Sequence, residues 1–433
     1  MKKILFLLSV LCPSLVFSQQ VITLGVEKCT QMALCSSEEM QIAQIECRQA
    51  ELQRRIAQAA FTPKIEGSAM GVYMPTNLDM TSMQVIMKGM YMAGVTLTQP
   101  IFVGGKIVAG HALSKIGEKA ANDKKRLKKS EIIASSEQAY WTLLAVERKV
   151  RMMERYTRQL ETLYSQTESA VTVGLATEND LGRVRAHRDN IRYQTLRAKN
   201  GYELSRMALC YQIGVDFDTR IILADSLITI PTKENFVGDA SRRAELSLLE
   251  AQVHAGKYQQ RMARADLLPS LALSLGYNYF GNVKMQTITM LPDGTPFPYT
   301  SKMQQGLCIG MLALKVPIFH WGEGWKKLKS VKYDTRRAEL ELQKTRRLLT
   351  LEVQQAQNNL EESLLLCLSA QTAMEAAEEN LRVSTERYGV NMSTLTELLD
   401  AQSEWQKAES SLIEAQSQYK IYKVAYLKAT GQF

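Results

Sequence analysis

Residue types that commonly carry out chemistry are few in this sequence and are scattered along it. The four histidines stand far from one another and from any cysteine, so their spacing predicts no zinc site: they are His111, His187, His254 and His320. No nucleophile–base–acid constellation, glycine-rich phosphate loop or HExxH motif occurs. The sequence therefore predicts a protein that is not an enzyme and that has no cofactor and no metal site.

Cysteine gives no ligand pattern either. Apart from Cys12, six cysteines occur without a CxxC pair or a regular spacing: Cys29, Cys35, Cys47, Cys210, Cys308 and Cys367. A chain of 433 residues with long helical stretches does not need a disulfide framework. We expect these thiols to be small, buried apolar side chains.

Methionine is the one residue type with a soft sulfur ligand that is clustered in the sequence. Seven methionines fall between residues 70 and 92 and four more follow in the second half: Met70, Met74, Met80, Met83, Met87, Met90 and Met92, then Met285, Met290, Met303 and Met311. Clustered thioethers can hold Cu(I) or Ag(I), which is one hypothesis for this segment. Methionine also fills irregular surfaces as a flexible apolar residue, and this is the interpretation that we favour from the sequence.

The charge is basic but dispersed. The formal net charge is +9, and 45% apolar with 22% charged residues is the composition of a folded chain rather than a disordered one. The densest basic run, Lys124 to Lys129, has no interleaved aromatic residues that could stack on bases. We therefore expect no nucleic-acid partner.

Residues 1–18 predict a secretory signal peptide. Two lysines precede the apolar stretch Ile4 to Leu11, and Val16-Phe17-Ser18 provides a cleavage site. Cys12 follows a leucine, whereas a lipid-modified cysteine normally follows a small residue, so its lipidation is an open alternative. No later stretch reaches the ~20 consecutive apolar residues of a membrane helix. The mature chain is thus expected either to stay in the periplasm or to cross a membrane as a closed barrel of strands.

The chain repeats itself with an offset of 217 residues. The motif Pro100-Ile101-Phe102 recurs as Pro317-Ile318-Phe319. Further pairs at the same offset are Leu97 and Leu314, Gly105 and Gly322, Val173 and Val390, Leu181 and Leu398, Tyr202 and Tyr419, and Gly214 and Gly431. A shared offset over this length indicates an internal duplication, with a first repeat at 19–214, a linker at 215–240 and a second repeat at 241–433.

Each repeat predicts the same order of elements. A helix comes first and is stopped by Pro63 or Pro269. Two strands of alternating pattern follow, at about 64–74 and 93–102 in the first repeat and about 270–280 and 307–319 in the second. The second strand ends at the motif that contains Pro100 or Pro317, and Gly105 or Gly322 then forms the turn into a long helix. We expect a mixed, mainly α fold.

The long helix of the second repeat carries a heptad pattern with one large and one small position. The large positions are Val353, Leu360, Cys367, Met374, Leu381 and Tyr388, and the small ones are Ala356, Ser363, Ala370, Ala377 and Ser384. The first repeat keeps the frame, and the returning helix continues it through Leu398, Trp405, Leu412 and Tyr419. Small residues in a seam let helices approach closely, which suits the wall of a helical tube.

The long helix also exceeds what a compact enzyme uses. A helix from Gly105 to Val173 would be about 100 Å long at ~1.5 Å per residue. Gly174 and Asn391 stand between the outgoing and returning helices, and these two residue types best tolerate the left-handed conformation of a tight turn. The sequence therefore predicts two helical hairpins with these residues at their tips.

This order of elements, written twice, resembles the TolC family of outer-membrane efflux proteins. The resemblance covers essentially the whole mature chain and is carried by Pro100-Ile101-Phe102-Val103-Gly104-Gly105, by Val173 to Leu181 and by Leu398-Leu399-Asp400-Ala401. It implies a homotrimer in outer-membrane lipid, in which four strands per protomer close a twelve-stranded β-barrel joined to a long α-helical barrel in the periplasm. A periplasmic adaptor protein would dock below, with an inner-membrane transporter of the RND class or, alternatively, of the ABC or MFS class.

The resemblance further implies where the duct closes and where the adaptor docks. The periplasmic gate would use Asp180, Tyr388, Glu397 and Asp400. The docking turns would be Gly174, Leu175, Ala176 and Thr177 with Asn391, Met392, Ser393 and Thr394. Ser393 stands where the family's best-known member has an arginine, so Arg183 is the remaining candidate partner for Asp180. A solvated helix face is the alternative interpretation of the acidic residues.

The cargo is not determined by the sequence. The main hypothesis is export of small molecules such as drugs or other toxic compounds, and the alternatives are protein export in a type I secretion system and a Cu/Ag efflux duct. A periplasmic coiled-coil scaffold without a pore would explain the heptads but not the two pairs of strands.

Overall fold

The computed structural model describes residues 21–75, 78–80, 83–86, 89–225, 230–231, 238–292 and 294–433. The expected signal peptide, Cys12 and Met87 lie outside this part of the chain. The chain divides into two compact units. The helical unit comprises Met1–Ile42, Arg126–Ala244 and Arg346–Phe433, and the sheet unit comprises Ala43–Lys125 and Glu245–Thr345. Each unit takes segments from both sequence repeats, so the repeats interleave in space.

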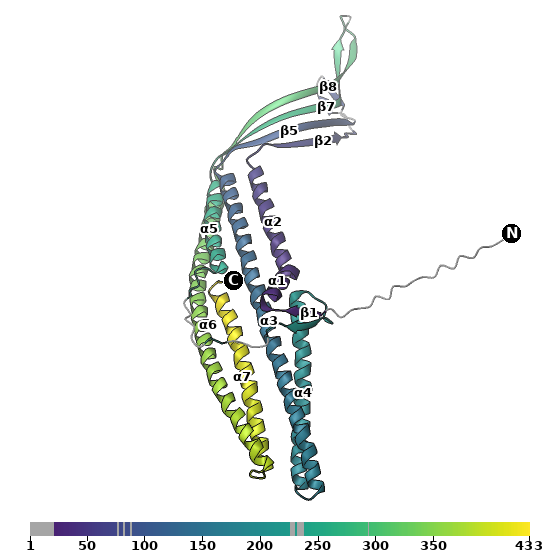
Figure 1. Ribbon diagram of the computed structural model, residues 1–433. Coiled ribbons are helices and arrows are strands. Elements are labelled where there is room, and N and C mark those ends of the chain that lie inside the picture. The colour runs from purple at the N-terminus through teal and green to yellow at the C-terminus, as the bar shows by residue number, and fades with distance from the viewer. Residues whose placement is uncertain are drawn as a thin grey trace, which may run out of the picture. The chain divides into compact units, whose positions relative to one another are not determined.

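The sheet unit is built on four long antiparallel strands, which run side by side (Figure 1). They are β2 (Lys64–Val72), β5 (Met90–Val103), β7 (Ser270–Met290) and β8 (Pro296–Lys315). β5 pairs with β2 and β7, and β8 pairs with β7. In the described part of the chain, β2 and β8 each have one partner, so the sheet has two open edges. Two short strands, β3 (Leu78–Met80) and β4 (Met83–Ile86), extend it beside the far end of β7.

The strands of the second repeat differ from those that the sequence predicts. β7 continues to Met290 rather than ending near 280, because it remains paired with β8 across an irregularity between Phe280 and Val283. β8 ends at Lys315, before Pro317-Ile318-Phe319. The reason is the register: Lys315 pairs with Ser270, the first residue of β7, so the residues after Lys315 have no strand beside them. Pro317 also lacks the N–H that a ladder needs.

Alternation along the strands gives the sheet two different faces. The apolar face carries Ile65 and Ala69 of β2, Tyr91, Val95 and Leu97 of β5, Leu275, Tyr277 and Tyr279 of β7, and Cys308 and Leu312 of β8. The mixed face carries Glu66, Ser68, Met70, Val72, Met90, Met92, Thr96, Ser274, Asn278 and Phe280, and on β8 Gln305, Leu307, Ile309 and Met311. The rings of Tyr91 and Tyr279 lie 6.3 Å apart on the apolar face, and the Tyr91 ring fills the space left by Gly281.

Helices continue the sheet unit from the ends of the strands. They are α5 (Ala244–Ala265) and parts of α2 (Glu38–Ala59), α3 (Lys106–Thr172) and α6 (Glu323–Gly389). Asp266 lies between Lys106 and Lys327, with Nζ–Oδ distances of 2.6 and 3.0 Å. The hydrogen bond from Lys106 is the main reason that the pKa of Asp266 is below its ordinary value. This carboxylate therefore ties the start of α3 to the start of α6.

Two antiparallel helix pairs form the helical unit: α3 with α4 (Glu178–Ile213), and α6 with α7 (Leu395–Ala429) (Figure 1). The heptad residues form the seam between α6 and α7. Leu360, Cys367 and Ala370 lie in one buried cluster with Leu412, Ala415 and Tyr419. Within the described residues, no helix is both long and apolar enough to cross a bilayer.

The linker predicted at 215–240 contains structure that the sequence analysis missed. β6 (Arg220–Leu223) pairs in parallel with β1 (Val21–Leu24) beside α1 (Val26–Ser36). Tyr140 of α3 is buried against this pair, and its hydroxyl donates to Asp225 Oδ2 over 2.5 Å. This contact fastens the linker to α3.

The cysteines are only partly as expected. All six are free thiols, and Cys29, Cys210 and Cys367 are buried. Cys35 and Cys308 are exposed, which corrects the expectation that every thiol is buried. Cys308 is exposed because it lies on the apolar face of the sheet, which no other described segment of the sheet unit covers.

Candidate functional site

The two turns at the hairpin tips have the same backbone construction. Gly174 and Asn391 adopt positive φ values of 76° and 59°. The amide of Leu175 donates to the Ala170 carbonyl over 2.8 Å, and the amide of Met392 donates to the Arg387 carbonyl over 2.7 Å. Both are Schellman closures, in which a left-handed residue lets the chain satisfy the last carbonyls of a helix. The left-handed residues are those that the sequence placed at the tips.

A capping box opens the returning helix in each repeat. Asp180 N donates to Thr177 Oγ1 over 3.1 Å, and Thr177 N donates to Asp180 Oδ2 over 3.2 Å. Glu397 N donates to Thr394 Oγ1 over 3.2 Å, and Thr394 N donates to Glu397 Oε2 over 3.3 Å. Hydrogen bonds from the Thr177 side chain and amide lower the pKa of Asp180. Two of the acids assigned to the gate therefore also hold the helix starts in shape.

The other two gate candidates lie in different environments. Asp400 is exposed one turn after Glu397, and no hydrogen bond or ion pair engages its carboxylate among the described residues. Tyr388 is half-buried and lines a cavity of about 450 Å³ between α3, α6 and α7, together with Leu163, Leu398 and Gln402. Among the three acidic candidates, Asp180 and Glu397 accept hydrogen bonds in caps, whereas Asp400 does not.

Arg183 makes a contact other than the one considered from the sequence. Its Nη1 donates to Thr396 Oγ1 over 2.8 Å, which links α4 to the start of α7. Its charge is only a minor contributor to the lowered pKa of Asp180. Arg183 stands 217 residues before Asp400, so the two repeats place opposite charges at equivalent positions. No sequence pattern pointed to Thr396.

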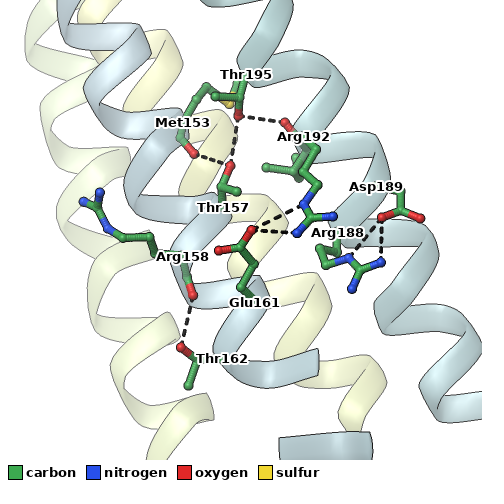
Figure 2. Close-up of polar contacts among 10 residues, drawn as sticks. Met153, Thr157, Arg158, Glu161, Thr162, Arg188, Asp189, Arg192 and Thr195 are labelled. Atoms are coloured by element: carbon green, nitrogen blue, oxygen red, sulfur yellow. Dashed lines mark hydrogen bonds and ion pairs between the residues drawn. The ribbon is translucent and has the colours of Figure 1, made fainter. Parts of the chain in front are cut away.

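Above the tips, charged side chains tie the helices together. Within the first hairpin, Glu161 of α3 accepts from Arg192 of α4 over 2.9 Å, and the hydroxyls of Thr157 and Thr195 lie 2.9 Å apart (Figure 2). The guanidinium of Arg188, which appears in the same view, lies 4.1 Å from the centre of the Tyr164 ring. These contacts fix α3 against α4 several helical turns away from the tip.

Between the hairpins, Arg155 of α3 pairs with Glu409 of α7 and lies 5.7 Å from the centre of the Trp405 ring. Lys149 reaches Glu414 over 2.7 Å. Burial raises the pKa of Glu409, and the Arg155 charge opposes that shift. Sequence reasoning missed this cross-hairpin set, because the partners are more than 250 residues apart and each reads as part of a charged helix face.

Large apolar side chains remain exposed in the helical unit. At the tips these are Val173, Leu175, Val390 and Met392, and Leu175 is 84% exposed. On α4 they are Tyr193, Leu196, Leu204, Met207 and Tyr211. At 100° per residue the five α4 side chains fall on one narrow stripe, opposite the buried Ile191, Leu209 and Ile213. We call this set the α4 stripe.

The chain matches the family described as "Outer membrane efflux protein" over residues 29–215 and 240–432. It is 24% identical to the outer membrane protein TolC of Vibrio cholerae serotype O1, over 63% of this chain and 60% of that protein. It is also 24% identical to TolC of Escherichia coli strain K12, over 78% of this chain and 69% of that protein. The chain thus spans somewhat less than two thirds of the V. cholerae relative.

Solved structures have the same fold. The outer membrane protein VceC of Vibrio cholerae matches with a TM-score of 0.77 at 18% identity, over 94% of this chain and 96% of that one. The match covers both hairpins and the sheet, since so little of either chain is left out. At this identity the likeness concerns the fold alone.

Proposed function

The chain belongs to the outer membrane efflux protein family, and on that premise we propose that it is the outer-membrane exit duct of a tripartite efflux pump. The observation that carries the proposal is the family match across both repeats. Family and fold are those of a channel rather than of an enzyme. The duct passes small toxic molecules, delivered by a periplasmic adaptor and an inner-membrane transporter, to the medium.

The sheet supports a trimeric barrel as the membrane part. A single sheet with open edges at β2 and β8 leaves backbone groups unpaired, which lipid does not tolerate. Three copies, joined β8 to β2, give twelve strands in a closed ring. The apolar face then meets lipid, and Tyr91, Tyr277 and Tyr279 supply aromatic side chains suited to a membrane interface. The mixed face lines the pore.

The α4 stripe supports the trimer independently. A helix that buries one face within the protomer and exposes an apolar stripe on the other needs a second packing partner. Exposed leucines on α6, among them Leu348, Leu351 and Leu365, offer a matching surface on a neighbouring copy. We propose that α4 of one protomer packs against α6 of the next and closes a helical tunnel in the periplasm.

The tips serve as the docking surface and gate in this proposal. Exposed apolar side chains at the end of a charged helical unit suit contact with an adaptor, and Leu175 is the most exposed of them. Asp180, Tyr388, Glu397 and Asp400 stand just above them. In a trimer these residues would ring one axis and narrow the entrance.

Transport is tested by deleting the gene and restoring it on a plasmid. We expect the deletion to raise intracellular accumulation of an efflux dye and to lower the tolerated drug concentration, with recovery by the parent chain. Crosslinking at Leu175, followed by mass spectrometry, identifies the partners. An RND transporter in the crosslinked complex supports small-molecule efflux, whereas an ABC transporter with a secreted protein would replace it by type I secretion. Unchanged accumulation after deletion would count against any efflux role.

The tip turn gives a matched pair of variants. Gly174 has φ 76° and open space around its Cβ position, so a substitution there acts through the backbone alone. Gly174→Val should strain the turn by roughly 1–2 kcal/mol, since a β-branched residue disfavours positive φ. Gly174→Asn should be tolerated, because asparagine holds the same conformation at Asn391. We expect lower adaptor crosslinking and drug tolerance for valine only, and equal values for both variants would place docking elsewhere.

A further inference from the structure

The methionines of β2 and β5 lie on one face of the sheet. The described parts of these strands contain Met70, Met90 and Met92, and all three occupy the mixed face. The apolar face of the same two strands carries Ile65, Ala69, Tyr91, Val95 and Leu97 but no methionine. If methionine served here as a general apolar residue for lipid contact, it would occupy the apolar face.

The strand register brings the three thioethers together. Met70 is directly opposite Met92, and Met90 pairs with Val72, so Met90 is the diagonal neighbour of Met70. Cβ atoms of directly opposed residues lie about 5 Å apart and those of diagonal neighbours about 7 Å apart. Methionine has three rotatable side-chain bonds, so three such side chains can turn their sulfur atoms toward one point.

Both polar and apolar side chains surround the three methionines on the mixed face. Ser68 and Thr96 share the mixed face with the methionines, and Asn278 covers Gly94 on the same face. Met70 is 51% exposed. The apolar neighbours are Phe280, which pairs with Met92, and Val72, which pairs with Met90. Met90 and Met92 are half-buried, so a solute can reach the three thioethers without their being fully open to solvent.

We propose that Met70, Met90 and Met92 form a binding site for a soft monovalent cation, Cu(I) or Ag(I). Neutral thioether sulfur binds such ions and discriminates against Mg²⁺, Ca²⁺ and Zn²⁺, which prefer oxygen or nitrogen ligands or thiolate. Among the described residues, no group of three or more His, Cys, Asp and Glu side chains could hold a metal instead. The inference rests on the proposed function in one respect, because that function places the mixed face in a pore. The inference adds soft monovalent metal ions as a class of cargo.

The test uses the full-length protein purified in detergent. Cys35, Cys47 and Cys308 are first blocked with N-ethylmaleimide, because exposed and half-buried thiols also bind silver. The protein is then incubated with Ag(I), desalted and analysed for silver per protomer. The variant is Met70→Leu with Met90→Leu and Met92→Leu, in which leucine keeps nearly the same volume. The control is Met392→Leu, an exposed methionine outside the sheet.

We expect the parent and Met392→Leu to retain about one Ag(I) per protomer and the triple variant to retain less than about a tenth of that. Retention should be the same at pH 5 and pH 7, because a thioether carries no proton, whereas imidazole ligands would be protonated and would release the ion in acid. Cu(I) competed from a chelator under reducing conditions should rank the three proteins in the same order.

Equal retention in the triple variant and the parent would overturn the site, as would a loss of silver at pH 5. Neither result would affect drug efflux, which is measured in cells without added metal. Conversely, a deletion strain without an efflux phenotype would remove the proposed function while silver binding to the purified protein remained.

Discussion

Leu204→Asp is expected to convert the trimer into folded protomers and to abolish transport. Leu204 is 68% exposed in the protomer and lies at the middle of the α4 stripe. Covering a leucine in an interface contributes roughly 2 kcal/mol, and an aspartate there would instead bury a carboxylate without a partner. This loss of interface free energy occurs at every contact between neighbouring protomers of the trimer. We therefore expect few trimers to survive in detergent.

Leu175→Asp is the matched control for this change. Leu175 is more exposed than Leu204, at 84%, but it lies in the tip turn and outside the stripe. The Leu175→Asp substitution should therefore leave trimer assembly unchanged while weakening adaptor crosslinking. Native mass spectrometry reports the oligomeric state, and circular dichroism reports whether the protomer keeps its helices. A Leu204→Asp trimer as stable as the parent would show that α4 faces solvent or the lumen rather than a neighbouring protomer.

The sequence predicted the parts of this structure that depend on helix periodicity or on the chemistry of a single turn. The heptad frame placed Leu360, Cys367 and Ala370 in a seam, and all three are buried against α7. Gly174 and Asn391 were placed at the tips because few residues adopt positive φ, and both do. In each case one local rule was sufficient, since neither helix amphipathicity nor turn chemistry depends on a distant partner.

Elements that depend on distant partners were missed or shortened. β1 and β6 have four residues each and pair across about 200 residues of sequence, so no local signal distinguishes them from loop. The first strand of the second repeat was expected at about 270–280, so the far half of β7 was not predicted as strand. In the structure Asn282 takes φ 59° and donates to the Gly89 carbonyl over 3.0 Å, so the strand continues past it.

Two of the acidic residues that were assigned to the gate also belong to capping boxes, which the sequence analysis did not recognise. Thr177 with Asp180, and Thr394 with Glu397, fit the capping-box spacing, so a local reading of the sequence could have found both boxes. The family resemblance drew attention to the acids alone. The structure shows that Asp180 and Glu397 already accept hydrogen bonds from their own helix starts, whereas Asp400 does not stand in a cap.

Because Glu397 is engaged in a cap and Asp400 is not, we expect these two carboxylates to contribute unequally to ion selectivity. Glu397 lies at a helix N-terminus, where the helix dipole and the Thr394 amide partly compensate its charge. Asp400 is exposed and lies one turn further along α7. In a trimer, three copies of Asp400 around one axis would attract cations and bind a trivalent ion. Asp400→Asn should therefore raise the concentration of a trivalent blocker needed for half block by about tenfold.

Planar-bilayer recording tests the ranking of the acidic residues. Glu397→Gln keeps the capping geometry, since glutamine also serves at this position of the box, and it should change the block and the reversal potential less than Asp400→Asn does. The double variant Glu397→Gln with Asp400→Asn should lose most cation selectivity and still form trimers. Asp180→Asn, at the equivalent capped position of the first repeat, is the control and should resemble Glu397→Gln. If Glu397→Gln matched or exceeded Asp400→Asn in both measurements, the capped carboxylates would be the charges that face the pore, and the entrance would be narrowest at the helix starts.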